Sequence, residues 1–321
     1  MAISLEDLNS RMRIPPEETA RRLERYIQDR VDRLERDGVI LGLSGGVDSA
    51  VLAVLCRRAL GPGRTLALMM PERDSRPEHI RDALSLAESW GIETRRIDLT
   101  PHLRKLNVYD LLPLSRVPFA HGLRAFANRK LSSRYRQKTG ESVFAASLTG
   151  LRGNAYGRMI GRRTAYFRVK QRLRMVVLYL YGEIENRLVA EAANRSEYLI
   201  GYFVKHGCDH AADILPLLHL YKTQVRELAR FLGIAPRIID KPPSPDHIPG
   251  VLDEAAIGIP YEQLDLILLG RDLGWDAEDI ARALSIDRKK IEDVETMVRR
   301  SEHMRTLDAL EPPPPAGGTE A

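Results

Sequence analysis

The stretch that decides the fold is VILGLSGGVDS at residues 39–49. Its first five residues form a short apolar run, which indicates a buried strand, and residues 50–60 return to the apolar spacing of a helix. Two consecutive glycines between them indicate a turn. A strand, a glycine-rich turn and a helix in this order gather backbone N–H groups and a helix N-terminus around one point, which favours a bound phosphate. The sequence therefore predicts a nucleotide-binding loop.

Each position of this loop has an expected role. Glycines without a Cβ atom let the backbone approach an anion closely, and the two serines add hydroxyl donors. A bare carboxylate beside the phosphates would repel ATP, so we expect the loop's aspartate to bind Mg²⁺. The predicted ATP-binding residues of the loop are Ser44, Gly45, Gly46, Val47, Asp48 and Ser49.

The pattern continues on both sides of the loop. Helical spacing precedes it at residues 16–37, and further predicted strands and helices alternate after it. Alternation of this kind implies a parallel sheet, and right-handed crossovers place helices on both of its faces. The predicted fold class is thus α/β, a doubly wound, Rossmann-type parallel sheet with flanking helices. Its further predicted elements are strands at 65–70, 93–97 and 188–192 and helices at 77–90 and 222–232.

The composition narrows the class of protein. The chain has 321 residues, of which 44% are hydrophobic and 29% charged, as in an ordinary globular protein. No apolar run is long enough to span a bilayer and no signal peptide is evident, so we expect a cytoplasmic protein that does not bind membranes. Cys56 and Cys208 alone cannot form a disulfide framework or a paired-cysteine zinc module. A net charge of +5 favours anionic ligands.

One segment is unusually basic. Residues 121–175 contain 14 Lys or Arg residues against one acid, Glu141. Two interpretations stay open, a solvated loop and helix or a lid that binds an anion. We expect residues 1–310 to form one domain, with this basic lid or insertion at about 103–168, and residues 311–321 to be a disordered low-complexity tail.

The loop itself identifies a superfamily. It is not a Walker A loop, because GxxxxGK[ST] is absent. The pattern SGGVDS between a strand and a helix resembles instead the PP-loop of the N-type ATP pyrophosphatases, with their adenine nucleotide alpha hydrolase-like fold. That resemblance implies cleavage of ATP between its α and β phosphates and adenylation of a substrate. Members include NAD synthetases, GMP synthetases and tRNA-modifying enzymes, so the loop alone does not choose the substrate.

A second motif makes that choice. The stretches NRSEYLIGYFVKHGCDHAADILPLLHLYKTQVRELARFLGI at 194–234 and KPPSPDHIPGVLDEAAIGIPYEQLDLIL at 241–268 resemble the ammonia-dependent NAD synthetase family. The resemblance implies that Asp48 and Glu197 bind Mg²⁺ and that Lys222 and Ser244 bind ATP, with Asp48 and Lys222 as the catalytic residues. It also implies contacts with deamido-NAD from four residues, Arg172 in VKQRLRM, Lys205, Asp213 and His303 in SEHMR.

Each of these assignments has a plainer alternative. By default Lys222 is a solvated charge on a helix surface, and the same holds for Arg172 and His303. The aromatic residues Tyr202, Phe203 and Tyr221 are expected to be core or wall residues. The functional assignments therefore depend on the motif as a whole.

The chain departs from the family pattern at two places in this motif. Ala192 and Ala193 stand where the family has Gly-Thr before the metal-binding glutamate, so a threonine hydroxyl near ATP is lost. The family's YGDGG is replaced by HGCDHA with one residue inserted, and either Cys208 or Asp209 could take the place of the usual aspartate. A zinc site built from nearby His and Cys residues is not expected, because one thiolate is present and the spacing matches no common module. Those residues are His206, Cys208, His210 and His219.

The resemblance implies a ligase of NAD biosynthesis. The nicotinate carboxylate of deamido-NAD would attack the α-phosphate of ATP, releasing pyrophosphate, and ammonia would then displace AMP from the acyl-adenylate. The chain has no room for a glutaminase domain, so free ammonia or a separate amidotransferase is expected, and the family implies a homodimer. Two alternatives stay open, a PP-loop ligase that amidates another carboxylate and a tRNA-modifying enzyme. No paired CxxC motif or RNA-binding module supports the second, so a nucleic-acid partner is not expected.

Overall fold

The centre of the fold is a parallel sheet of four strands in the order β3-β2-β1-β4. The structure is a computed structural model that describes residues 4–112, 121–149, 155–243 and 252–305. In the registers of the sheet, Ile40 lies opposite Leu66 on one side and Val189 on the other. The strands are β1 (Gly38–Gly42), β2 (Thr65–Met69), β3 (Glu93–Arg96) and β4 (Arg187–Ala190).

The two faces of the sheet carry separate hydrophobic cores. Successive side chains of a strand point to opposite faces, so Val39 and Leu41 of β1 join one core while Ile40 joins the other. Both faces are apolar because both are covered by helices, as parallel sheets require. At the edge, β3 carries polar side chains and is partly exposed.

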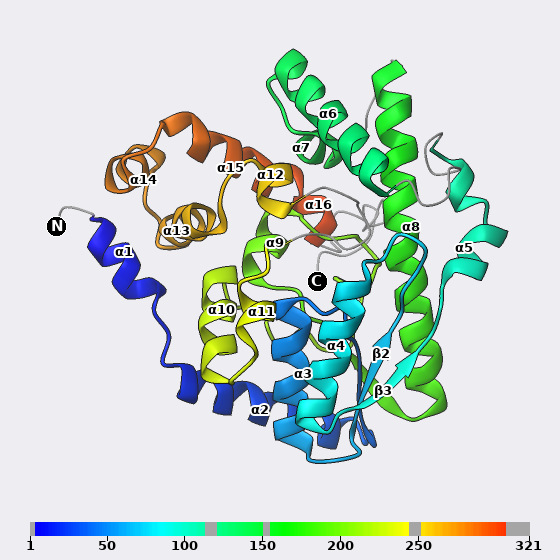
Figure 1. The fold of residues 1–321 in the computed structure, drawn as a ribbon. Helices are drawn as coiled ribbons and strands as arrows, with labels where there is room; N and C mark the ends of the chain where they lie inside the picture. The colour runs from blue at the N-terminus through cyan, green and yellow to red at the C-terminus, as the bar shows by residue number, and fades with distance from the viewer. Residues whose placement is uncertain (1–3, 113–120, 150–154, 244–251, 306–321) are drawn as a thin grey trace, which may run out of the picture.

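The first core lies between the sheet and a layer of helices (Figure 1). Some of these helices alternate with the strands along the chain, and others come from its C-terminal half. Its central helix α3 is buried along nearly all of its length. It lies between the sheet and α2, and α10 covers it further along. These helices are α2 (Pro16–Arg33), α3 (Val47–Leu60), α4 (Pro77–Trp90), α10 (Lys222–Phe231) and α11 (Pro236–Ile239).

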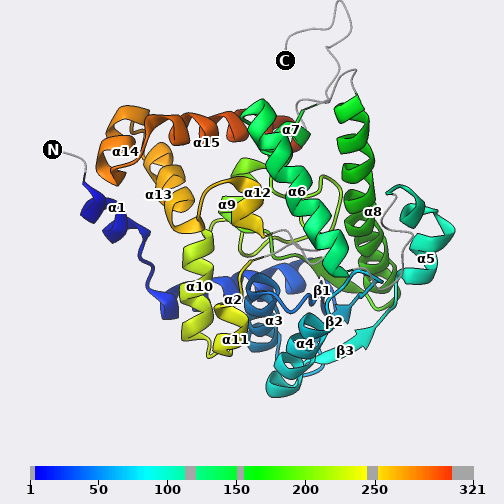
Figure 2. The same ribbon diagram turned by 45° about the horizontal axis from the view of Figure 1, so that its top comes forward.

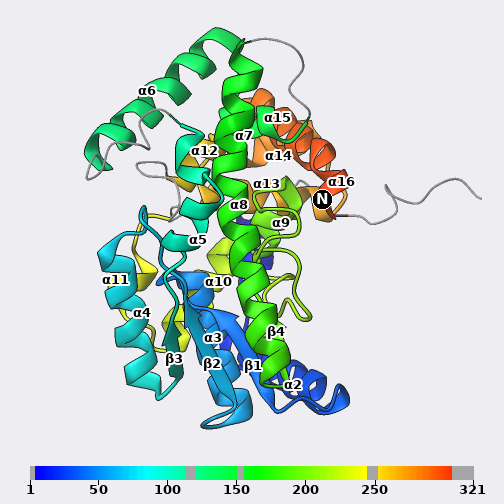
Figure 3. The same cartoon turned by 90° about the vertical axis from the view of Figure 1, so that its right-hand side faces the viewer.

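The second face is covered by the long helix α8, Ala155–Ile184. Its C-terminal part packs on β1 and β4, where Met175 and Leu178 enter the core. A helix of 30 residues is about 45 Å long, far longer than a strand of four or five residues. The other half of α8 therefore extends past the sheet (Figure 3). The segment between β3 and α8 contains α5 (Thr100–Lys105), the 3₁₀ helix η1 (Val108–Asp110), α6 (His121–Thr139) and α7 (Val143–Ser147).

A third, purely helical core stands beyond one end of the sheet (Figure 2). Tyr261 and Leu264 are fully buried in it. The helix α1 (Leu5–Met12) of the N-terminus contacts α13 in this layer. The other helices of the layer are α9 (Arg195–Ile200), α12 (Asp253–Ile257), α13 (Tyr261–Asp272), α14 (Ala277–Leu284), α15 (Arg288–Arg300) and α16 (Glu302–Arg305).

The predicted fold class is confirmed. Each predicted strand and helix is present, and its ends lie within a few residues of the predicted ends. The helix expected over 16–37 ends at Arg33, because the chain turns there before β1. The strand expected over 188–192 ends at Ala190, and the N–H of Glu191 donates to the carbonyl of Ile214 instead. In the described part of the chain, no helix is long and apolar enough to cross a bilayer.

Candidate active site

The predicted nucleotide loop forms the connection between β1 and α3. The Oγ atoms of Ser44 and Ser49 lie 3.0 Å apart, and the N–H of Gly46 donates to Ser44 Oγ at 3.3 Å. Gly45 has a φ of +79°, and a Cβ atom there would lie 2.1 Å from the carbonyl oxygen of His79. The backbone can make this turn only because Gly45 has no side chain.

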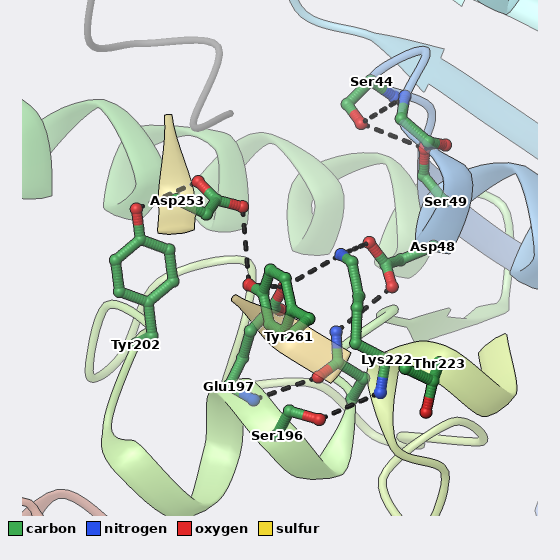
Figure 4. A network of polar contacts seen from close by, with 12 residues as sticks. Ser44, Asp48, Ser49, Ser196, Glu197, Tyr202, Lys222, Thr223, Asp253 and Tyr261 are labelled. Atoms are coloured by element: carbon green, nitrogen blue, oxygen red, sulfur yellow. Dashed lines mark hydrogen bonds and ion pairs between the residues drawn. The ribbon is translucent and has the colours of Figure 1, made fainter. Parts of the chain in front are cut away.

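The central feature of the site is a buried lysine between two carboxylates (Figure 4). The Nζ of Lys222 lies 2.5 Å from Asp48 Oδ2 and 3.0 Å from Glu197 Oε1. Lys222 is the first residue of α10, Asp48 lies in the first turn of α3 and Glu197 in the first turn of α9. Three helix starts thus converge on one ion-pair network.

Asn194 holds the two carboxylates in place. It is fully buried, and its Nδ2 donates to Asp48 Oδ1 at 3.1 Å. Its Oδ1 accepts from the backbone N–H of Glu197 at 3.0 Å, so Asn194 also caps α9. One amide side chain therefore fixes the aspartate and the start of the helix that carries the glutamate.

A third acid, Asp253, is linked to Glu197 through a tyrosine. The hydroxyl of Tyr261 donates to Glu197 Oε1 at 3.0 Å and lies 3.5 Å from Asp253 Oδ2. The hydroxyl of Tyr202 donates to Asp253 Oδ1 at 3.0 Å. The two tyrosines thus connect Asp253 to the lysine network.

Burial and crowding shift the protonation of these groups. Burial raises the pKa of Glu197, although Lys222 acts in the opposite direction. Burial raises the pKa of Asp253 to about 7, again against Lys222, and Glu197 adds to the rise. Burial by itself would lower the pKa of Lys222, but Asp48 and Glu197 raise it above its usual value. The lysine is therefore an ammonium that neutralises part of an acidic cluster.

The donor set fits Mg²⁺. Asp48 and Glu197 supply hard carboxylate oxygens, as this cation prefers, and in this structure both accept from Lys222 Nζ. Within the described ranges, no group of three or more His, Cys, Asp and Glu side chains has metal-binding geometry. Magnesium in phosphate-transferring sites is usually bound by one or two carboxylates together with phosphate oxygens, and this pair would supply the carboxylates.

A cavity of about 390 Å³ opens beside this network. Asp48, Glu197, Lys222 and Asp253 line it together with loop residues. Its other walls are α7, the half of α8 beyond the sheet, the start of α4 and the segment before α12. The cavity is large enough for a nucleotide-sized ligand.

Both departures from the family pattern border this cavity. Ala192, Ala193, Cys208 and Asp209 all line it. Asp209 Oδ2 accepts from the Nε2 of Gln171 at 3.2 Å, and the Cys208 thiol donates to Gln171 Oε1 at 3.3 Å. Burial, with Glu197 nearby, raises the pKa of Asp209 to about 6. Asp209 is thus the carboxylate of this segment in the cavity wall.

The predicted substrate-binding residues fall into two places. Arg172 Nε donates to the carbonyl of Lys205 at 3.3 Å, and Lys205 Nζ donates to the carbonyl of His303 at 2.6 Å. These three residues are therefore neighbours. Asp213 is exposed and accepts from the backbone N–H of Val189 at 2.8 Å and from the hydroxyl of Tyr179 at 3.1 Å. None of the four lines the cavity, and Ser244 lies outside the described residues.

Sequence reasoning assigned no role to several residues of the network. Asp253 and Tyr261 belong to the quoted stretch LDEAAIGIPY, and Asn194 opens the quoted NRSE. The motif thus contained them, but nothing in the spacing shows that Tyr261 lies beside Glu197. That contact depends on the packing of α13 against α9.

A parallel α/β sheet, a glycine turn ahead of α3 and a carboxylate pair at the turn define a nucleotide-binding fold of the PP-loop type. The family model that describes NAD synthase matches residues 19–166 and 152–308. The chain is 38% identical over 280 residues to the NH(3)-dependent NAD(+) synthetase of Thermotoga neapolitana, covering 87% of this chain and 91% of that protein. The chain therefore belongs to the NAD synthase family, and the predicted family is confirmed.

Solved structures agree with this fold. NMN synthetase from Francisella tularensis matches with a TM-score of 0.68 and 29% identity, over 94% of this chain and all of that one. NH3-dependent NAD synthetase from Campylobacter jejuni matches with a TM-score of 0.62 and 22% identity, over 92% and 98% of the two chains. As a member of the NAD synthase family the protein is an enzyme, and it shares its fold with these solved structures.

Proposed function

We propose that the protein converts deamido-NAD into NAD, with ATP as the source of energy and ammonia as the nitrogen donor. The observation that carries the proposal is the buried Lys222 between Asp48 and Glu197, directly beside the nucleotide loop and its cavity. The curated relative from Thermotoga neapolitana, named as an NH(3)-dependent NAD(+) synthetase, supports the same activity.

In this mechanism the protein mainly positions charges. The nicotinate carboxylate attacks the α-phosphorus of ATP, the bond to the bridging oxygen breaks, and pyrophosphate leaves from the acyl-adenylate. Asp48 and Glu197 would hold Mg²⁺, which would supply charge neutralisation for the phosphates. Lys222 then interacts with phosphate oxygens in place of its carboxylate partners, and the N–H groups of the loop hold the phosphates. Ammonia attacks the acyl carbon and AMP leaves.

The acceptor substrate needs a second binding region. We propose that Arg172, Lys205 and His303, which the structure brings together, and Asp213 bind deamido-NAD. Arg172 and Lys205 supply cations suited to a dinucleotide's phosphates. Of the two nitrogen sources expected from the sequence, ammonia is favoured by the names of the relatives. A separate amidotransferase stays a prediction.

A second candidate is a mononucleotide acceptor. The structural match to the NMN synthetase of Francisella tularensis has a higher TM-score than that to the Campylobacter NAD synthetase, 0.68 against 0.62. This favours testing nicotinate mononucleotide beside deamido-NAD. The adenylation chemistry would be unchanged, because the reacting carboxylate is the same.

We further propose a homodimer formed through α8. Three large apolar side chains are exposed on this helix, Val176, Leu180 and Ile184, between 52% and 68% exposed. Their spacing of four residues places them on one face of the helix. Exposed apolar side chains in a continuous row indicate a protein contact, and a second copy of α8 offers a matching row by two-fold symmetry.

The function is tested by incubating the purified protein with ATP, Mg²⁺, ammonium and either deamido-NAD or nicotinate mononucleotide. NAD formed together with AMP and pyrophosphate, and absent with Asp48→Ala, supports the first proposal. Efficient formation of the mononucleotide amide with little NAD supports the second. If neither acceptor yields an amide while the folded protein still binds ATP, both proposals are wrong.

A further inference from the structure

A buried arginine on α8 has no partner for its charge among the described residues. Arg163 is 7% exposed and lines the nucleotide cavity. Its Nη1 is buried without a hydrogen-bond partner, and no described residue forms an ion pair with it. The ring of Phe167 lies beside it, with its centroid 5.7 Å from the guanidinium carbon. A buried cation in this state is unfavourable.

Comparison with the other buried cations shows how unusual this is. Among the described residues the buried Lys and Arg side chains are Arg163, Lys170 and Lys222. Lys170 contacts Glu72 at 2.9 Å and Asp74 at 2.8 Å, and Lys222 contacts the two carboxylates described above. Arg163 alone of the three lacks a carboxylate partner among the described residues.

Burial lowers the pKa of Arg163 to about 10, which still leaves its guanidinium charged at neutral pH. The anion it lacks must therefore come from outside the described chain. The open space beside it is the cavity that the nucleotide loop also lines.

The position of Arg163 on α8 directs it to that space. α8 packs on β1 and β4 through its C-terminal part, and Arg163 belongs to the half that extends past the sheet. Phe167, Gln171 and Arg174 line the same cavity at helical spacing. Arg163 thus belongs to one face of α8, and that face is a wall of the cavity.

We propose that Arg163 binds a phosphate oxyanion of the substrate in this cavity, as a binding residue outside both sequence motifs. A guanidinium offers parallel N–H donors that match two phosphate oxygens. The inference rests on the proposed function for the source of the phosphate, which is either ATP or the acceptor nucleotide. Of the two interpretations of the basic segment 121–175, the proposal supports anion binding, and it assigns that role to one side chain, Arg163.

The alternative is a structural role, in which Arg163 merely packs against Phe167. The two roles predict opposite effects on stability. If Arg163 is an unpaired cation kept for a ligand, replacing it with an apolar side chain of similar length raises the melting temperature of the ligand-free protein. If it supports the fold, the same change lowers it.

The test uses Arg163→Met, Arg163→Lys and, as a matched control, Arg162→Met, which removes the same charge from an exposed neighbour on α8. The first readout is the melting temperature without ligand. The second is the affinity for inorganic pyrophosphate, measured by calorimetry without any acceptor, so that the result does not depend on the acceptor's identity. We expect Arg163→Met to melt higher than wild type and to bind pyrophosphate on the order of 10- to 100-fold more weakly.

Arg163→Lys should bind pyrophosphate with intermediate affinity, and Arg162→Met should match wild type in both readouts. Steady-state kinetics then separate the sources: a raised KM for ATP alone assigns the phosphate to ATP, and a raised KM for the acceptor alone assigns it to that nucleotide. Arg163→Met with a lower melting temperature and wild-type pyrophosphate affinity and KM values overturns the proposal. Failure to form NAD in the wild-type assay would instead count against the proposed function.

Discussion

Replacing Lys222 with methionine tests the central network. The substitution keeps an unbranched side chain of similar length in a site that is 2% exposed, but it removes the ammonium between Asp48 and Glu197. The two carboxylates then face each other with Asn194 and Tyr261 as their remaining described donors. We expect a large loss of stability in the metal-free protein.

The size of that loss follows from the burial of the partners. Removing one member of a buried ion pair costs about 3–5 kcal/mol. The side chains of Asp48 and Glu197 are 20% and 18% exposed, so water partly stabilises them and the lower end, about 3 kcal/mol, is expected. For a chain of this size that corresponds to a fall in Tm of about 4–5 °C.

Calorimetry in the presence of EDTA and then of Mg²⁺ gives the decisive comparison. In the variant the cation should bind between the carboxylates without competition from Lys222, so Mg²⁺ should raise its Tm more than it raises that of wild type. Lys289→Met is the control, because Lys289 pairs with Asp293 on the surface and its loss should leave Tm unchanged. If Lys222→Met has the Tm of wild type in EDTA, or if Mg²⁺ does not raise its Tm, the account of the network is wrong.

Three further predictions follow from the same structure. Gly45→Ala should abolish ATP binding in an equilibrium titration, because the new Cβ would collide with the carbonyl of His79; retained affinity would contradict the strained turn. Burial raises the pKa of Asp253 from 3.8 to about 7, so its contribution to metal-free stability is full below about pH 4 and is lost as the pH rises to about 7. Urea titrations in EDTA should show this fall, up to about 4 kcal/mol, and Asp253→Asn should flatten it. Leu180→Asp should yield a monomer in sedimentation experiments, and an unchanged dimer would exclude the exposed face of α8 as the interface.

Much of the fold could be predicted because its signals are local. The apolar runs of β1 and β2 are buried on both faces, so each strand appears in the sequence as a continuous apolar stretch. The helix α4 begins at Pro77 and ends before Gly91, and both residues are ordinary helix boundary signals.

The long helix α8 could not be predicted in the same way. Its C-terminal half covers a sheet and exposes an apolar row to solvent, whereas its other half borders a cavity with basic side chains. The two halves thus face different surroundings, and no single apolar stripe runs along the helix. A periodicity search depends on such a stripe, so residues 121–175 were recognised only by their charge.

The site was predictable where a motif contained it. Asp48 was identified from the loop, and Glu197 and Lys222 from the second motif at 194–234, and the structure brings the three together. The contacts that hold them were not predictable, since Asn194 reaches Asp48 across 146 residues and Tyr261 reaches Glu197 across 64. Such contacts arise from the packing of helices, which spacing alone does not encode.

The distribution of charge around the cavity supports the proposed metal-bound nucleotide as its ligand. The cavity wall carries carboxylates, which would repel a bare phosphate chain, and α8 adds guanidinium groups, which would attract one. A ligand that carries both a divalent cation and phosphates satisfies both kinds of group. Two of the fourteen basic residues of the segment 121–175 are not available to a nucleic-acid surface, because Lys170 is neutralised in the core and Arg163 lines the cavity. The carboxylates in the cavity wall are Asp48, Glu191, Glu197, Asp209 and Asp253, and the guanidinium groups that α8 adds are Arg163, Arg168 and Arg174.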